Sequence, residues 1–202
     1  MKYLLFSLSL FIVSCTSKLT NTTFKTVKEV EDYATSVETD EALQLFKKEM
    51  KNESGFVVST VKGGYINNEL VKLEENSINQ KATNIFKFYL KNGQLIYSTQ
   101  EEFIMNYDGN KPLSRMYKIY YGDNSIMNAS VKEVVSQYDR EMIDMNKVET
   151  KPYSTSYSSL MRANEKKINA LKALIEPLAK GAEVNNKATK EKMERIKQSQ
   201  QN

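Results

Sequence analysis

The chain has 202 residues, 40% of them hydrophobic, and carries a formal net charge of +4 from 29 basic and 25 acidic side chains. It contains one cysteine, no histidine and no tryptophan. These counts exclude a Ser-His-Asp triad, a Cys-His dyad and a histidine-ligated zinc site, and a single cysteine can neither close an internal disulfide nor hold an iron–sulfur cluster.

A short apolar segment opens the chain. After the basic start Met1-Lys2, residues 3–13 are apolar except for two serines. This run of 11 residues is shorter than the roughly 20 that a membrane-spanning helix needs. It is typical of the hydrophobic region of a signal peptide, which we predict over residues 1–14.

The single cysteine follows this segment directly. The tetrapeptide Ile12-Val13-Ser14-Cys15 resembles the lipobox of bacterial lipoproteins. The resemblance implies cleavage before Cys15, a diacylglyceryl lipid on its sulfur and acylation of the new amino terminus, for example by palmitate. Two or more acyl chains hold a protein stably at a bilayer. Lipidated Cys15 is therefore the predicted site residue, and residues 15–25 are the predicted tether.

The same resemblance bears on location. Thr16, rather than an aspartate, follows the cysteine, which in this family favours sorting to the outer membrane, on either the periplasmic face or the cell surface. An ordinary secretory signal that happens to contain a cysteine, or an uncleaved anchor, is the alternative interpretation.

The segment after the tether has the pattern of a helix. Thr26 and Glu29 have the spacing of a capping box, in which each side chain satisfies a backbone N–H of the other residue. Apolar residues then recur at helical spacing as far as Met50. We predict helix over residues 27–51, with a break near residue 39.

From residue 54 the pattern changes to short β-branched and aromatic runs separated by turn residues. The strongest signal is Asn92-Gly93 between two apolar runs, because this dipeptide supplies the positive φ angles of a type I′ hairpin turn. The turns are too short for parallel crossovers. The sequence therefore predicts an antiparallel meander of about five or six strands. Its runs are 55–61, 65–74 (a strand pair or one kinked strand), 85–90, 95–105, 116–121 and 126–127.

The C-terminal third is predicted to be helical. Ser130 and Glu133 repeat the capping-box spacing, which favours a helix over residues 131–145. A second apolar face over 160–178 predicts another helix, ended by Pro177 and Gly181. Fold class is therefore α+β, with a single domain over residues 26–180. Residues 181–202 form a basic tail, expected to be disordered or frayed helix.

Three stretches share one form, a tyrosine followed after three residues by Asn or Asp and then by an aliphatic pair. They begin at Tyr65, Tyr89 and Tyr120. Through Gly64-Tyr65 and Asn92-Gly93 the chain resembles small lipoproteins of Bacteroidetes that have no assigned activity. The resemblance covers about a third of the chain, and it implies a β-sheet and an envelope location.

Several pairs of polar residues invite a catalytic interpretation. Ser59 and Lys62 have the Ser-x-x-Lys spacing of penicillin-recognising enzymes, but residues three apart on a strand point to opposite faces. The neighbouring acids Glu74-Glu75 and Glu101-Glu102 face apart for the same reason, so they do not form the carboxylate pair of a glycosidase. Asp108-Gly109 favours a turn over a calcium loop.

Two features remain open at this stage. Five tyrosines could line one sheet face open to a ligand, or could belong to the core; they are Tyr65, Tyr89, Tyr97, Tyr117 and Tyr121. The basic C-terminal tail could contact anionic lipid headgroups or anionic glycan, or could simply be solvated.

We therefore expect a lipid-anchored protein of the bacterial cell envelope with a binding or structural role and no catalytic activity, cofactor, metal or nucleic acid. One alternative is an inhibitor or immunity-type binder of an envelope enzyme or toxin. Another is a carrier of a hydrophobic ligand, which needs an internal apolar cavity. An enzyme without histidine would need a deep pocket that holds a carboxylate with a strongly shifted pKa.

Overall fold

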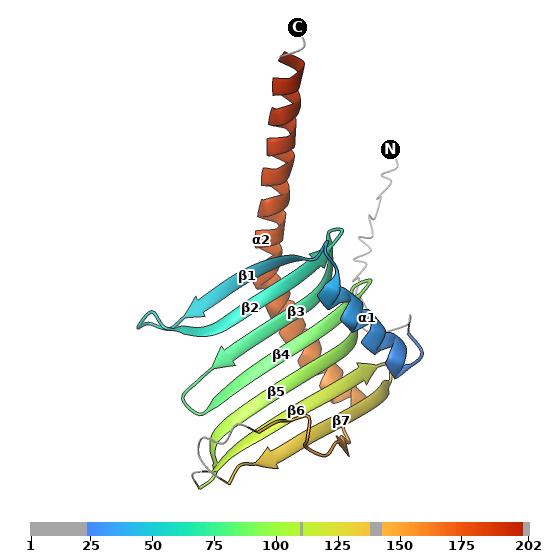
Figure 1. Cartoon of the computed structure of the whole chain (residues 1–202), viewed down its shortest axis with the longest axis vertical. Coiled ribbons are helices and arrows are strands. Elements are labelled where there is room, and N and C mark those ends of the chain that lie inside the picture. The colour runs from blue at the N-terminus through green and yellow to red at the C-terminus, as the bar shows by residue number, and fades with distance from the viewer. Residues whose placement is uncertain (1–23, 110, 138–142, 200–202) are drawn as a thin grey trace, which may run out of the picture.

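The computed structural model describes residues 24–109, 111–137 and 143–199, with backbone alone over 185–199. Residues 1–14, the lipobox and Cys15 lie outside the described residues. The described chain is α+β, as predicted, with one antiparallel sheet of eight strands in sequence order and two helices (Figure 1). The elements are α1 (Val27–Thr39), β1 (Gln44–Lys51), β2 (Val57–Ile66), β3 (Glu69–Ile78), β4 (Ala82–Lys91), β5 (Gln94–Asp108), β6 (Lys111–Tyr121), β7 (Ile126–Val135), β8 (Lys151–Pro152) and α2 (Tyr157–Ser199).

The first helix begins as predicted but is shorter. The Thr26 side chain accepts from the Glu29 N–H at 3.2 Å, and the Glu29 carboxylate accepts from the Thr26 N–H at 3.1 Å, which completes the capping box. The helix ends at Thr39, and the predicted helix over residues 44–51 is wrong, because this segment is strand β1. Its alternation places Phe46 and Met50 together on one face, where both pack against the core. Pairing with β2 therefore decides its structure.

The predicted Asn92-Gly93 hairpin forms, and two strands beyond the predicted six are present. Gly63 and Gly64, which separate two of the predicted runs, lie inside β2, and the turn to β3 comes later, at Asn67-Asn68. Asn92 and Gly93 have φ angles of 50° and 73°, and Asn67 and Asn68 have 50° and 65°, as type I′ turns require. The extra strands are β1 and the two-residue β8.

The second capping-box prediction is wrong within the described residues, since 126–135 form β7. The β-branched Val131, Val134 and Val135 pair with β6 in register, and such residues favour a strand over a helix. The rest of that predicted helix includes residues 138–142, which are not described.

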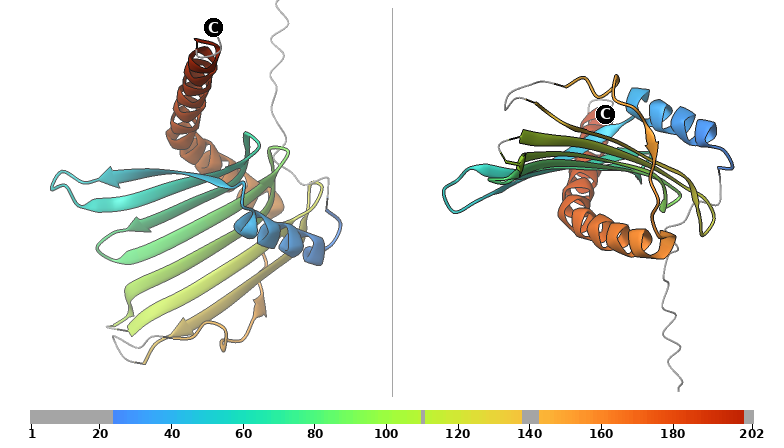
Figure 2. Two further views of the ribbon diagram at one scale, coloured as in Figure 1. Left: turned by 45° about the horizontal axis from the view of Figure 1, so that its top comes forward. Right: turned by 90° about the horizontal axis from the view of Figure 1, so that it is seen from below.

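The C-terminal helix continues past its predicted end. α2 passes through Pro177 and Gly181 and reaches Ser199. Proline lacks a backbone N–H and clashes with the preceding turn, so it kinks a helix without always ending it. In α2 the bend lies where the helix leaves the sheet (Figure 2).

The two helices lie on opposite faces of the sheet (Figure 2). α2 lies across one face, and four of its residues at helical spacing are buried there; they are Met161, Ile168, Leu171 and Ile175. They pack against strand residues that include Val61, Leu73, Phe88 and Tyr121. The close approach depends on Gly63 in β2, since a Cβ at this position would lie 2.3 Å from Cγ2 of Ile175.

The other face carries a ladder of stacked tyrosines beneath α1. The Tyr89 and Tyr97 rings are 5.4 Å apart between centroids, and the Tyr97 and Tyr120 rings are 4.7 Å apart. Val30, Ala34 and Val37 of α1 are buried in the same cluster as these three rings. The short helix thus contributes one apolar stripe to a second, smaller core.

Acidic residues on α1 tie the helix to this ladder. The Tyr89 hydroxyl donates to Glu38 at 2.5 Å, and the Tyr120 hydroxyl donates to Glu31 at 2.6 Å. Lys72 of β3 makes an ion pair with Glu38 at 2.5 Å. Burial and the hydrogen bonds to these carboxylates raise the pKa of both tyrosines above the ordinary value. These phenols therefore act as hydrogen-bond donors at neutral pH.

The Glu38 contacts predict a dependence of stability on pH. Burial acts to raise the pKa of Glu38, but hydrogen bonds from Lys72 and Tyr89 and the charge of Lys72 outweigh it and hold this pKa below its ordinary value of 4.5. A lowered carboxylate pKa stabilises the fold above the unfolded-state pKa, and that stabilisation is lost as pH falls through the folded-state pKa. We expect the free energy of unfolding of Glu38→Gln to be lower than wild type at pH 7 and to fall less steeply below about pH 4.5.

Chemical denaturation between pH 7 and pH 3 measures this difference. Glu53→Gln is the matched control, because it makes the same charge change in the exposed β1–β2 turn. Identical pH profiles for the wild type and Glu38→Gln would contradict the role given to the Glu38 carboxylate.

Candidate functional site

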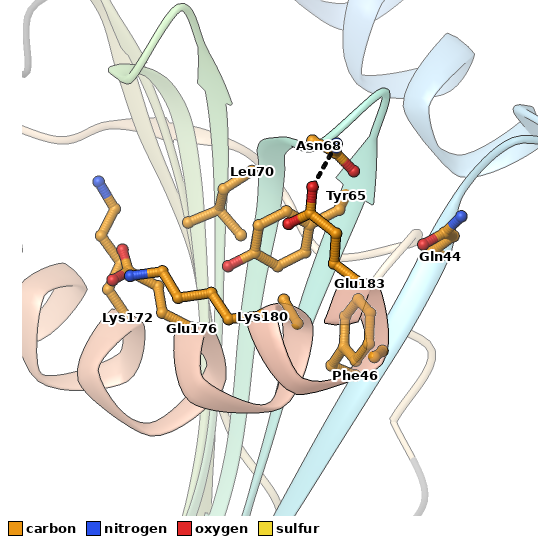
Figure 3. Close-up of a pocket in the computed structure, with 11 residues that line it drawn as sticks. Gln44, Phe46, Tyr65, Asn68, Leu70, Lys172, Glu176, Lys180 and Glu183 are labelled. Atoms are coloured by element: carbon orange, nitrogen blue, oxygen red, sulfur yellow. Dashed lines mark hydrogen bonds between the residues drawn. The ribbon is translucent and has the colours of Figure 1, made fainter. Parts of the chain in front are cut away.

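A pocket of about 400 Å³ lies between the start of β1, the β2–β3 hairpin and the part of α2 that leaves the sheet (Figure 3). Its lining residues come from four elements and their turns. They are Gln44, Phe46, Tyr65, Asn68, Leu70, Lys172, Glu176, Ala179, Lys180, Ala182 and Glu183. The volume is within the range of about 300–1,000 Å³ typical of small-molecule sites.

The sheet side of the pocket is apolar. Phe46 of β1 and Tyr65 of β2 meet edge to face, with ring centroids 5.6 Å apart and an interplanar angle of 85°. Leu70 of β3 is paired with Tyr65 in the sheet and lies on the same face. Their side chains pack against the margin of the larger core. This part of the pocket therefore suits an apolar group.

The helix side is charged. Lys172 and Glu176 precede Pro177 in α2, and Lys180 and Glu183 follow it. The side-chain amide of Asn68, in the β2–β3 turn, donates to Glu183 at 3.4 Å (Figure 3). This contact links the turn to the helix after its bend. The pocket thus combines an apolar floor with a rim that carries both signs of charge.

The Tyr65 hydroxyl is the polar group of the floor. It is shielded from solvent and has no hydrogen-bond partner among the described residues. It points toward the charged side chains of α2 (Figure 3). Burial, and the nearby charge of Glu176, raise its pKa. At neutral pH it therefore remains a protonated donor, and a buried donor without a partner is costly unless a ligand or water accepts from it.

The polar pairs singled out in the sequence have structural contacts instead. Ser59 and Lys62 point to opposite faces of β2, as expected. The Ser59 hydroxyl donates to Glu75 at 3.4 Å, and Lys62 pairs with Glu74 at 2.8 Å. Glu75 also forms an ion pair with Lys167 of α2. The Glu75–Lys167 pair joins the sheet to α2, and the other two contacts join β2 to β3.

The second acidic pair, Glu101-Glu102, consists of adjacent residues of β5, so the two side chains lie on opposite faces of the sheet. Glu102 pairs with Arg115 of β6 at 3.4 Å, and Arg115 also contacts Glu133 of β7. Asp108 is the last residue of β5 and pairs with Lys111 of β6, and Gly109, in the turn that follows, has a φ of 63°. Within the described residues, no group of three or more acidic or thiol side chains is placed to hold a metal ion.

The five tyrosines do not line one open face, so that hypothesis is wrong. Tyr89 and Tyr97 lie under α1, whereas Tyr65, Tyr117 and Tyr121 lie on the face toward α2. Tyr121 is fully buried, where its hydroxyl contacts Ser98 at 2.9 Å and accepts from Asn164 at 2.6 Å. Of the five, only Tyr65 lines the pocket.

Comparison of the chain with protein-family models, curated proteins and solved structures finds no match. No helix in the described part of the chain is both long and apolar enough to cross a membrane.

Proposed function

We propose that this chain is a lipid-anchored protein of the bacterial envelope whose folded domain binds a small amphipathic ligand without transforming it. The anchor is Cys15, at the outer membrane. It is supported by the position of the only cysteine, directly after a short apolar run and a lipobox-like tetrapeptide. The tether of residues 15–25 joins this anchor to the domain.

The pocket between the sheet and α2 supports ligand binding. Its apolar floor, formed by Phe46, Tyr65 and Leu70, suits the body of a ligand, and its charged rim suits a polar head. The unpartnered Tyr65 hydroxyl is the observation that carries the proposal. It offers one directed hydrogen bond inside the pocket, which is how ligand sites fix orientation. The charged rim favours an amphipathic ligand over a purely hydrophobic one.

A bulky side chain at Ala182 is expected to fill the pocket. Ala182 is half-buried and lines it, so Ala182→Phe places a ring in the ligand's space without removing a core group. The probe is 8-anilinonaphthalene-1-sulfonate, which has an aromatic body and one anionic head. We expect titration of its fluorescence to show at least a tenfold weaker affinity for Ala182→Phe than for wild type.

Ala173→Phe is the matched control, because residue 173 is exposed on the same helix outside the pocket. It is expected to bind the probe as wild type does. Tyr65→Phe keeps the ring and removes the hydroxyl, and we expect it to weaken binding about fivefold, the equivalent of one hydrogen bond. Equal affinities for Ala182→Phe and Ala173→Phe would refute binding in this pocket.

A further inference from the structure

The exposed apolar side chains of the described chain are concentrated along one side of the sheet, at the ends of the strands. Seven of the ten large hydrophobic residues that are exposed lie at the end of the strands away from α1. They are Phe56, Val57, Ile78, Phe103, Met105, Tyr107 and Val135. We call this end the tip edge; it comprises the β1–β2 and β3–β4 turns, the described residues of the β5–β6 turn and the end of β7.

The meander places these residues together. In an antiparallel sheet in sequence order, every second connection lies at the same end. The three turns of the tip edge therefore lie side by side, away from α1 (Figure 1). Each contributes one strongly exposed side chain: Phe56 is 71% exposed, Ile78 54% and Tyr107 52%. We take this concentration of exposed apolar side chains at one end of the strands as a candidate interaction surface.

Each turn also carries a lysine within five residues of its apolar residue. These are Lys51, Lys81 and Lys111, and the acidic residues of the same turns are Glu53 and Asp108. A lysine can lay its methylene stem along an apolar surface and keep its ammonium group among phosphates. Aromatic and aliphatic side chains next to lysines are the composition of segments that lie in the lipid–water interface.

We propose that the tip edge inserts into the lipid–water interface of a bilayer that contains anionic lipids. The exposed side chains project from three separate turns. A fluid interface accepts separate projections, whereas a folded protein partner would need a matching surface for each of them. Phe56, Ile78 and Tyr107 would enter the interface, and the three lysines would meet the headgroups.

The length of the tether is compatible with this arrangement. The dozen residues from Cys15 to the start of α1 span at most about 40 Å, and a ten-residue strand is about 33 Å long. The tether can therefore reach the bilayer when the strands stand on the tip edge and the start of α1 lies at their far end. The proposal rests on the proposed anchor at Cys15 but concerns a different surface from the pocket, and it stands whether or not the pocket binds a ligand.

The absence of tryptophan from the chain allows a direct test. Phe56→Trp and Tyr107→Trp each place a single reporter on the tip edge. Leu45→Trp is the control, because Leu45 is 60% exposed at the opposite end of β1. The mature protein is purified from membranes and reconstituted in vesicles of phosphatidylcholine and phosphatidylglycerol, with or without brominated acyl chains. Tryptophan emission is recorded for each variant.

We expect blue-shifted emission and at least threefold stronger quenching by brominated lipid for Phe56→Trp and Tyr107→Trp than for Leu45→Trp. Quenching at the tips should weaken in vesicles of phosphatidylcholine alone. Equal quenching of all three variants, or stronger quenching of Leu45→Trp, overturns the proposal. Tip quenching that is the same without phosphatidylglycerol overturns the role given to the lysines.

Discussion

Replacing Cys15 with serine is expected to release the protein from membranes or to leave it unprocessed, with residues 1–14 still attached. The thiol is the only group in the chain that can take a thioether-linked lipid, because no second cysteine exists. With two or more acyl chains, each buried CH₂ contributes about 0.8 kcal/mol to anchoring. We therefore expect Cys15→Ser to lose nearly all of its lipid-mediated membrane attachment, and not only a part of it.

Intact mass of the protein extracted from membranes measures this effect. The wild-type chain should begin at Cys15 and carry added acyl mass. Thr16→Ser, which keeps the cysteine and changes its neighbour, is the matched control and should remain acylated and membrane-bound. A wild-type chain with an unmodified cysteine would contradict the anchor. The protein would then be a secreted domain or one held by its uncleaved N-terminal segment.

Gly63→Ala is expected to destabilise the fold by about 1–3 kcal/mol, the usual cost of overpacking a core. A Cβ here would lie 2.3 Å from Cγ2 and 3.2 Å from Cβ of Ile175. Ile175 is a residue of α2 and is fully buried against the sheet, so the helix must move away from β2 or the strand must bend. Chemical denaturation gives the free energy of unfolding.

Two further variants separate this contact from a general effect of alanine. Gly181→Ala lies in the same helix with no atom within 4 Å of the new Cβ, and it should stabilise by up to about 1 kcal/mol through helix propensity. Ile175→Ala alone should cost about 2–5 kcal/mol. The double variant should lose less unfolding free energy than the two single variants lose together, because the new methyl group occupies the space that Ile175 leaves. Strict additivity would show that residues 63 and 175 do not clash.

The parts of the fold that local chemistry determines were predictable from sequence. Thr26 and Glu29 define the start of α1 because the capping box involves four neighbouring residues only. Asn92-Gly93 defines the β4–β5 turn because few residues tolerate two successive positive φ angles. The antiparallel meander followed from such short turns.

Elements whose structure depends on distant partners were predicted wrongly. The apolar residues of segment 44–51 are compatible with a helix as well as with a strand. The strand forms because it lets Phe46 and Met50 pack against the core between the sheet and α2. At 126–135 the capping-box spacing of Ser130 and Glu133 does not lead to a helix, because pairing with β6 along the whole segment stabilises a strand more than one local cap stabilises a helix. The sequence predicts that Pro177 ends the helix, but packing on the sheet holds α2 before that residue, and the helix only bends there.

The pocket could not have been found in the sequence for the same reason. Phe46 lay in a predicted helix, and Lys180 and Glu183 lay at the predicted helix end and in the predicted tail. The pocket exists only because β1 is a strand and α2 continues past Pro177. Tyr65 is one of the five tyrosines that the sequence singles out, but nothing local distinguishes it from Tyr121, which is a core residue.

The order of the elements has a consequence for how the chain acquires its structure. Each long strand pairs with the strand next to it in sequence, so the sheet can grow hairpin by hairpin as the chain emerges from its N-terminus. Among the described residues, most of the cover of its apolar face, with Val61, Leu73 and Phe88, comes from α2, which is made last. Until Ile168 and Ile175 are available, a nearly complete sheet presents a bare hydrophobic side. The last helix therefore sets the interval during which the nascent protein needs protection from aggregation.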